Sequence, residues 1–153
     1  MHDDTNELIL GRLDDFEFEL DIILAGIDRN LQPHIYLISE PGDAMSFDEV
    51  GFCCKGSGET HTDPVFAFYG YSPSLPTEQV LYIAYEAKKR AEMAGSVGKQ
   101  TDAWVVNEKG CYKVKQETLE ALDECKMIED LSSLIGGIEI ELDDEPEVPP
   151  DEM

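Results

Sequence analysis

The chain has 153 residues, of which 42% are hydrophobic and 29% charged, and its formal net charge is −23. This length suits one domain with a hydrophobic core, and the charge excludes most polyanionic partners, because nucleic acids and anionic membranes would be repelled. No apolar run approaches the roughly 20 residues of a membrane helix, and the acidic start lacks the cationic segment of a secretory signal, so we expect a cytoplasmic location.

Composition divides the chain into three parts. Residues 1–19 are interpreted as an acidic lead-in, and residues 20–135 as one folded domain. Residues 136–153 form an acidic tail, whose end from Asp143 has three prolines and no basic residue. Such a composition predicts disorder, and the simplest interpretation of the tail is a solvated segment that aids solubility, with recruitment of a basic partner as the alternative.

The first half of the domain is predicted to be a three-stranded antiparallel meander. Leu20–Ile27 is almost continuously apolar, which is typical of a strand buried on both faces. His34–Ser39 and Val50–Lys55 follow as the second and third strands, and the turns between them are short. Short connections favour antiparallel neighbours.

Helices and a hairpin are predicted in the second half. Gly56-Ser57-Gly58 ends the third strand, and Thr62 or Asp63 can cap a short helix that has Pro64 at its first position and stops near Gly70. The remaining predicted elements are a helix from Thr77 to about Ala94, a hairpin of Asp102–Asn107 and Cys111–Lys115, a helix from Glu117 to about Leu134 and an edge strand at Ile138–Leu142.

Several short segments resemble one known family when they are taken in order. They are Ala25-Gly26-Ile27-Asp28 followed by Pro33-His34-Ile35-Tyr36, then Glu40-Pro41-Gly42, Lys55-Gly56-Ser57-Gly58, the helix Thr77–Ala91 and the strand Thr101–Val106. Over about residues 20–115 their order and spacing resemble the distal half of a proteasome-type subunit of the N-terminal-nucleophile (Ntn) hydrolase family.

The resemblance implies an α+β fold in which antiparallel β-sheets are layered with helices, and which is incomplete in this chain as a half-sandwich. Members of this family are typically rings or stacked rings. Active members are threonine-type peptidases, whose N-terminal nucleophile uses its own amine as the base, supported by a lysine and an aspartate from the first half of the fold.

The chain departs from the active members of this family at the positions that carry the chemistry. It begins Met1-His2, and the first strand pair, with its threonine and lysine, is not recognised ahead of Leu20. Ser57 is the one match near the nucleophile and is expected to be a supporting residue at most. Ala94 and Val97 stand where active members carry an Asp and a Ser, with Ser96 as a shifted substitute. We therefore assign no catalytic, cofactor-binding or metal-binding residue.

Other residues allow a sharper and a plainer interpretation. Glu59, His61 and Asp63 could converge on a metal, although this spacing before a helix is also ordinary capping and loop chemistry. Ser57 and His61 could be a nucleophile and its base, although a serine between glycines is usually part of a turn. His34 is expected to be a half-buried strand histidine rather than a ligand.

Two further sets of residues are predicted to be structural. The aromatic set is expected to pack against the sheet, with an oligomer contact as the alternative; it comprises Phe66, Phe68, Tyr69 and Tyr71. The four cysteines are expected to be reduced, buried small hydrophobes, because no CxxC spacing or export signal is present; they are Cys53, Cys54, Cys111 and Cys125.

The functional expectation is a peptidase-like subunit that lacks its nucleophile half and is inactive alone. The alternative is a non-catalytic subunit or assembly factor of a proteasome-like complex, and a third class is a small binding domain unrelated to proteasomes. A meander without its companion sheet would expose an apolar face, so we expect homo- or hetero-oligomers, or a separate N-terminal half, as partners. Peptides would be substrates of the complete complex, and no cofactor is expected.

Overall fold

The structure is a computed structural model, and it describes residues 20–125 and 139–146. Within these ranges the chain is a mixed α+β protein with small antiparallel sheets, as the sequence predicts. The predicted lead-in at 1–19, the later part of the helix predicted to reach Leu134 and the tail from residue 147 lie outside the described residues.

The first two strands form the predicted antiparallel pair. Strand β1 spans Asp21–Ile27 and β2 spans Pro33–Ser39, with Asp21 opposite Ser39 and Ile27 opposite Pro33. The Asp28 carboxylate fixes the turn between them by accepting hydrogen bonds at 2.8 Å from the backbone N–H groups of Asn30 and Gln32. Asp is favoured at such turns because its side chain can satisfy nearby backbone donors.

The third strand is not where the sequence predicts it. Strand β3 is Asp43–Ser46, paired with β2, whereas Val50–Lys55 has no strand partner among the described residues. Gly51 turns the chain out of the sheet with φ +79°, a conformation that glycine adopts without strain, and its N–H bonds the Phe47 carbonyl at 2.7 Å. Phe52 then stacks on Phe66 with ring centroids 4.0 Å apart, so packing takes the place of strand pairing.

Helix α2 begins earlier than predicted. It spans Glu59–Phe68 with Gly58 as its N-cap, so Pro64 lies inside the helix and neither Thr62 nor Asp63 caps it. The N–H of Glu59 bonds the carbonyl of Gly56 at 3.0 Å, which satisfies one of the donors that a helix start leaves unpaired. A backbone carbonyl of the preceding turn is therefore the acceptor at the start of the helix, whereas the sequence predicted a side-chain acceptor from Thr62 or Asp63.

Helix α3, Thr77–Ala91, ends three residues before the predicted Ala94 and lies at the centre of the core. One hydrophobic cluster joins it to the hairpin and α4, and its buried members are Tyr82, Tyr85, Val114, Leu119 and Leu122. A second cluster joins it to α2, and its buried members are Val65, Phe66, Ile83 and Ala87. Both faces of α3 are thus covered by parts of the same chain.

The predicted hairpin and final helix are present with shifted ends. Strand β4 is Trp104–Asn107, β5 is Gly110–Lys113 and α4 is Gln116–Glu124. The edge strand predicted at Ile138–Leu142 is reduced, within residues 139–146, to an isolated bridge between Leu142 and Val114. Backbone bonds from Lys115 to Glu141 at 2.9 Å and from Asp143 to Lys113 at 3.0 Å place this segment beside the end of β5.

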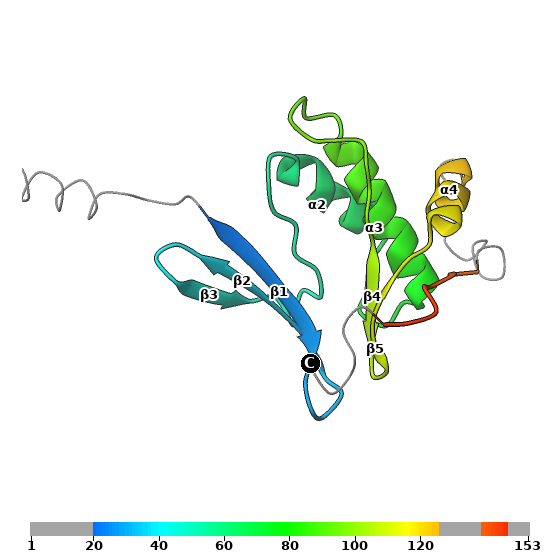
Figure 1. Ribbon diagram of the computed structural model, residues 1–153. Helices are drawn as coiled ribbons and strands as arrows, with labels where there is room; N and C mark the ends of the chain where they lie inside the picture. The colour runs from blue at the N-terminus through cyan, green and yellow to red at the C-terminus, as the bar shows by residue number, and fades with distance from the viewer. Residues whose placement is uncertain (1–19, 126–138, 147–153) are drawn as a thin grey trace, which may run out of the picture.

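The β1–β2–β3 sheet contributes no buried residue. All residues from 20 to 57 are exposed or half-buried, so the prediction that β1 is buried on both faces is wrong. Figure 1 shows the reason, since the helices gather around α3 while the sheet stands away from them, beyond the segment that leads from β3 to α2. In the described ranges, no helix combines the length and apolar character that spanning a membrane requires.

Candidate functional site

The Gly56-Ser57-Gly58 turn owes both of its glycines to structure. Gly56 has φ +116°, which side chains rarely adopt, and Gly58 is buried against α3. A Cβ on Gly58 would lie 2.5 Å from the Ala91 Cβ and 3.1 Å from the Ala91 carbonyl oxygen, closer than packed atoms approach. Ser57 is exposed between them, and no hydrogen bond of its hydroxyl is found within the described ranges. The motif is therefore a close contact between a turn and a helix.

This contact brings Ser57's turn to the C-terminal end of α3, where the resemblance puts two supporting polar groups. Both positions are apolar here: Ala94 and Val97 form a turn in which the Val97 N–H bonds the Ala94 carbonyl at 3.0 Å. Ser96, the alternative, is exposed. The Lys88 ammonium closes this loop by donating to the Gly98 carbonyl at 3.0 Å. The loop thus has structural contacts at the positions to which the resemblance assigns catalytic support.

The sharper interpretations of His61 gain no support from the geometry. Glu59 and Asp63 are one helical turn apart on α2, so His61, two residues from each, projects from a different side of the helix. Within residues 20–125 and 139–146, no group of three or more His, Cys, Asp or Glu side chains is placed to hold a metal ion. No hydrogen bond links His61 to Ser57 in the same ranges.

A hollow lies beside the Gly56-Ser57-Gly58 turn, and Gly56 is part of its lining. Leu20, Asp21 and Ile23 of the β1 region line it together with the start of α2, and its volume is about 620 Å³. The Lys55 ammonium lies there, 3.3 Å from the Glu59 carboxylate and 3.5 Å from that of Asp21. The Glu59 hydrogen bond and the charge of Asp21 raise the pKa of Lys55. The lysine is a paired cation, which suits a structural link between β1 and α2 better than proton transfer.

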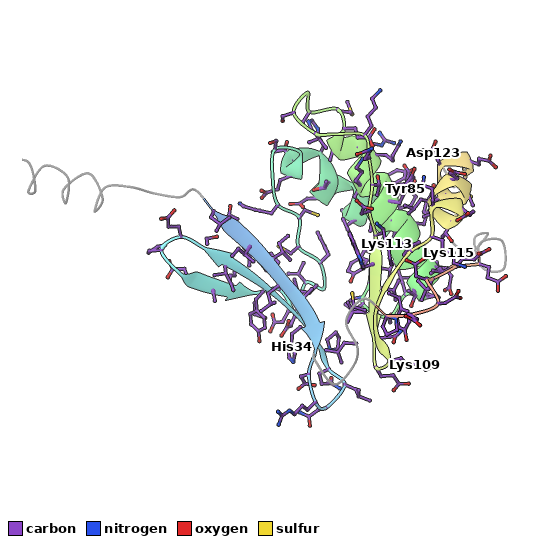
Figure 2. The ribbon with its side chains drawn as sticks, in the orientation of Figure 1. His34, Tyr85, Lys109, Lys113, Lys115 and Asp123 are labelled. Atoms are coloured by element: carbon purple, nitrogen blue, oxygen red, sulfur yellow. The ribbon has the colours of Figure 1, made fainter. Side chains whose placement is uncertain are left out.

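His34 lies in a cluster that the sequence did not reveal. The His34 Nδ1 is 2.8 Å from the Asp48 carboxylate, and its Nε2 is 3.7 Å from the Asp28 carboxylate. His34 is labelled in Figure 2, where it lies at one end of the sheet. The hydrogen bond to Asp48 and the two carboxylate charges raise the pKa of His34, and the hydrogen bond from His34 lowers the pKa of Asp48. The Ile35 N–H also donates to Asp48 at 2.8 Å. His34 is half-buried on a strand, as predicted, and its imidazolium form is favoured.

An apolar groove begins beside this histidine. It has a volume of about 430 Å³ and runs between β1 and β2 on one side and the β4–β5 hairpin on the other. Leu24, Ile27 and Tyr36 line one wall, and Val106 and Cys111 line the other. The groove is as small as the lower range of ligand pockets, and it is also the place where two sheets of one fold approach each other.

A second polar cluster ties α3 to α4. The Tyr85 hydroxyl donates to Asp123 at 3.0 Å, and the Lys89 ammonium lies 3.2 Å from the same carboxylate. Burial, followed by the hydrogen bond to Asp123, raises the pKa of Tyr85 to about 12. Figure 2 shows Tyr85 and Asp123 together at the junction of the two helices. Thirty-eight positions separate them, so no local pattern pointed to the pair.

The aromatic set packs against helices more than against the sheet. Phe66 and Tyr71 meet edge to face at 5.4 Å beside Phe52, and Tyr69 meets Tyr82 of α3 at 5.6 Å. Phe68 is 67% exposed. Three of the four rings are packed, but against α3 and the segment before α2, so the prediction that the set packs against the sheet is wrong.

All four cysteines are free thiols, as predicted, and all are half-buried. Burial is the main cause that raises the pKa of Cys53 and Cys54, and nearby carboxylates act in the same direction. A thiol with a raised pKa is a poor nucleophile at neutral pH. Neither of these two thiols is therefore favoured as a nucleophile.

No model of a protein family matches the chain, and neither a curated protein nor a solved structure matches it.

Proposed function

We propose that the chain is a subunit of a proteasome-like complex that has the Ntn-hydrolase fold and is inactive by itself, because the nucleophile half must come from elsewhere. The observation that carries the proposal is the β1–β2–β3 sheet, in which no residue is buried although its strands are apolar on both sides. Strands of this composition are interior strands in folded proteins. A second layer of structure, supplied by a separate polypeptide or a longer chain, would cover them.

The surroundings of Ser57 fit a chain that needs completion. The serine is exposed on a turn that packs through Gly58 against Ala91, and Lys55 and Glu59 on either side of the turn line the hollow. A nucleophile half that covered this exposed turn would meet Ser57 as a supporting hydroxyl. In the isolated chain, Ser57 has no base within hydrogen-bonding distance among the described residues, so peptide hydrolysis would have no starting point.

A non-catalytic subunit or assembly factor is the second candidate. It is favoured by Ala94 and Val97, which bring no polar group to the end of α3. Under this proposal the fold is retained for contacts with neighbouring subunits, and the polar support of an active centre is not needed. The two candidates share the exposed sheet and differ in whether the completed complex hydrolyses peptides.

Two measurements on the purified chain test the proposal. Incubation with fluorogenic peptides and with a covalent probe for N-terminal threonines should give no turnover and no labelled protein. Light scattering across a concentration series should show association, or the protein should bind a dye that reports exposed apolar surface, because the sheet is uncovered. A monodisperse monomer that binds no such dye would contradict the proposal, and turnover by the isolated chain would refute its inactivity.

Recombining the chain with a candidate partner separates the two candidates. Peptide turnover that appears only in the mixture, and falls in a Ser57→Ala variant, would support the peptidase subunit. A stable complex without turnover would support the non-catalytic subunit. Gly95→Ala is a suitable control for both, since nothing lies within 4 Å of the added Cβ.

A further inference from the structure

The outer edge of β1 has no hydrogen-bonded neighbour among the described residues, although the strand from Leu24 onward lines the groove that faces the β4–β5 hairpin. Among the described residues, β1 is hydrogen-bonded to β2 alone, so it is an edge strand of a three-stranded sheet. An open edge presents a row of backbone N–H and C=O groups that can pair with another chain. Proteins usually protect such edges with charges, prolines or a covering element, and β1 has neither charge nor proline between Ile22 and Ile27.

The two faces beside this edge are both apolar. Ile22 and Leu24 point to one face and are 47% and 57% exposed, and Ile23 points to the other and is 41% exposed. The residues paired with them on β2 are also apolar, with Ile38 opposite Ile22 and Leu37 opposite Ile23. A strand added beyond β1 would extend both faces, and its own apolar side chains would contact β1 on each of them.

Acidic residues border both ends of the sheet. Between residues 20 and 50 the acidic side chains are Asp21, Glu40 and Asp43 at one end, and Asp28, Asp48 and Glu49 at the other. Arg29 is the one Arg or Lys in this stretch. Lys55 offsets Asp21 and His34 lies between Asp28 and Asp48, so the border stays negative but is partly neutralised.

We propose that the edge of β1 binds an extended segment of another polypeptide, with an apolar, strand-forming centre and Lys or Arg at both ends. The proposal rests on the function proposed above and specifies the chemistry of the partner. Strand addition gives affinity through main-chain hydrogen bonds and specificity through side chains. The apolar centre would match Ile22 to Leu24, and the basic ends would match the acidic border.

Charge argues against a second copy of this chain as the occupant. Two β1 edges paired antiparallel about Leu24 would bring Asp21 of each strand to the end where the other strand continues into Asp28. Asp21 would lie opposite Ile27 and one position from Asp28, so carboxylates on the two faces would be brought near each other at both ends, which is unfavourable. With a net charge of −23 on each copy, the repulsion would extend beyond these pairs.

A peptide-binding experiment on the full chain tests the proposal. The probe is a fluorescent peptide of about seven alternating valine and threonine residues flanked by lysines, read by anisotropy at low salt. Binding should protect the β1 amides from hydrogen exchange and leave those of α2 unchanged. A peptide with glutamates in place of the lysines should bind at least about tenfold more weakly. A peptide with alternate backbone amides N-methylated should lose binding, because it cannot form the ladder.

Two variants with the same substitution locate the site. Leu24→Lys puts a cation at the centre of β1 and should weaken binding of the lysine-flanked peptide by about tenfold. Leu31→Lys makes the same change at a residue that is also 57% exposed but lies in the turn after β1, and it should leave affinity within about twofold. Circular dichroism of each variant checks that the fold is kept.

The outcomes separate this proposal from the proposed function. Equal binding of the N-methylated peptide, or equal binding by both variants, would overturn strand addition at β1. Equal binding of the glutamate-flanked peptide would overturn the basic partner. Association of the chain, or turnover after recombination, would still support the proposed function in each of these cases. A monomeric chain without exposed apolar surface would remove both proposals.

Discussion

Ile83 and Ile22 have the same side chain and lie in two regions with opposite surroundings. Ile83 is fully buried on α3, between that helix and α2, whereas Ile22 on β1 is 47% exposed. The α3 core is closed by elements within about 60 residues of one another. The sheet has strands that are at least as apolar, yet the hairpin approaches them only across a groove and none of the sheet residues is buried.

The contrast shows that an apolar pattern in the sequence indicates a segment suited to burial. It does not show that the same chain supplies the structure that buries it. Strand β1 has the composition of an interior strand, and the described part of the chain does not supply the interior. Covering Ile22, Ile23 and Leu24 would contribute roughly 1 kcal/mol for each side chain, given how much of each is exposed. Binding of a partner at the sheet would gain this free energy. The core around α3 is already buried, so a partner that contacted it would gain none.

The largest expected effect comes from a matched pair of isoleucine truncations. Ile83→Ala should lower the free energy of unfolding by about 3 kcal/mol, because it leaves a cavity in a packed cluster. Ile22→Ala should lower it by less than about 1 kcal/mol in the isolated chain. Urea denaturation at equal protein concentrations measures both values. Equal costs would mean that the sheet is covered in solution, and the distinction between the two regions would fail.

A smaller effect is expected where a turn meets the core. Gly58→Ala should lower the free energy of unfolding by about 1–3 kcal/mol, because the new Cβ would overlap Ala91, whose backbone cannot move without shifting α3. The control is Gly95→Ala, which has open space and an ordinary φ and should change stability by less than about 1 kcal/mol. Similar values for the two variants would show that the turn does not pack tightly on α3.

The strongest local patterns predicted their elements well, and contacts distant in sequence account for the errors. Strands β1 and β2 and helix α3 follow from apolar runs, a turn at Asp28 and a regular helical stripe. The segment after Val50 has strand-like composition, but Phe52 is stacked on Phe66, fourteen positions away. A local pattern cannot distinguish these two uses of the same apolar residues.

The candidate sites also divide into one that a local pattern indicated and one that depends on contacts distant in sequence. The sequence singled out Ser57, and its turn does meet the end of α3, although Gly58 is there for packing and Gly56 for its backbone conformation. The cluster at His34 depends on Asp48, which β3 and its following turn bring across the sheet. Because β3 was predicted at the wrong residues, the register that places Asp48 beside His34 could not be derived.

A pH-dependent contribution is expected at the sheet from the cluster at His34. The pKa of His34 is raised by Asp48, so the stabilisation is complete below about pH 6.5 and is lost as the pH rises through the folded-state value. The pKa of Asp48 is lowered, so the stabilisation is present above about pH 4 and is lost as the pH falls through its folded-state value. The cluster therefore stabilises the sheet most between these limits.

Titration of the His34 imidazole by NMR measures this directly. Its midpoint should lie above the ordinary histidine value and should fall towards it in Asp48→Asn. Ile83→Ala is the matched control, because it changes the core and leaves the cluster intact, and it should not move the midpoint. A midpoint that is unchanged by Asp48→Asn would mean that the hydrogen bond to Asp48 does not form in solution.

The smallest effect is expected at Ser57, where the two regions meet. Gly58 packs in the core against Ala91 and Gly56 sets the turn through its positive φ, whereas Ser57 between them is exposed. Ser57→Ala should therefore change the free energy of unfolding by less than about 0.5 kcal/mol. Thr62→Val, which removes a buried hydroxyl that donates to the Glu59 carbonyl at 2.7 Å, should cost about 1 kcal/mol and serves as the comparison. If Ser57→Ala cost as much as Thr62→Val, the serine would be part of the core and would not be free to support a partner's chemistry. A negligible cost leaves the hydroxyl available on a rigid turn, and turnover by a completed complex is then the measurement in which its loss should be felt.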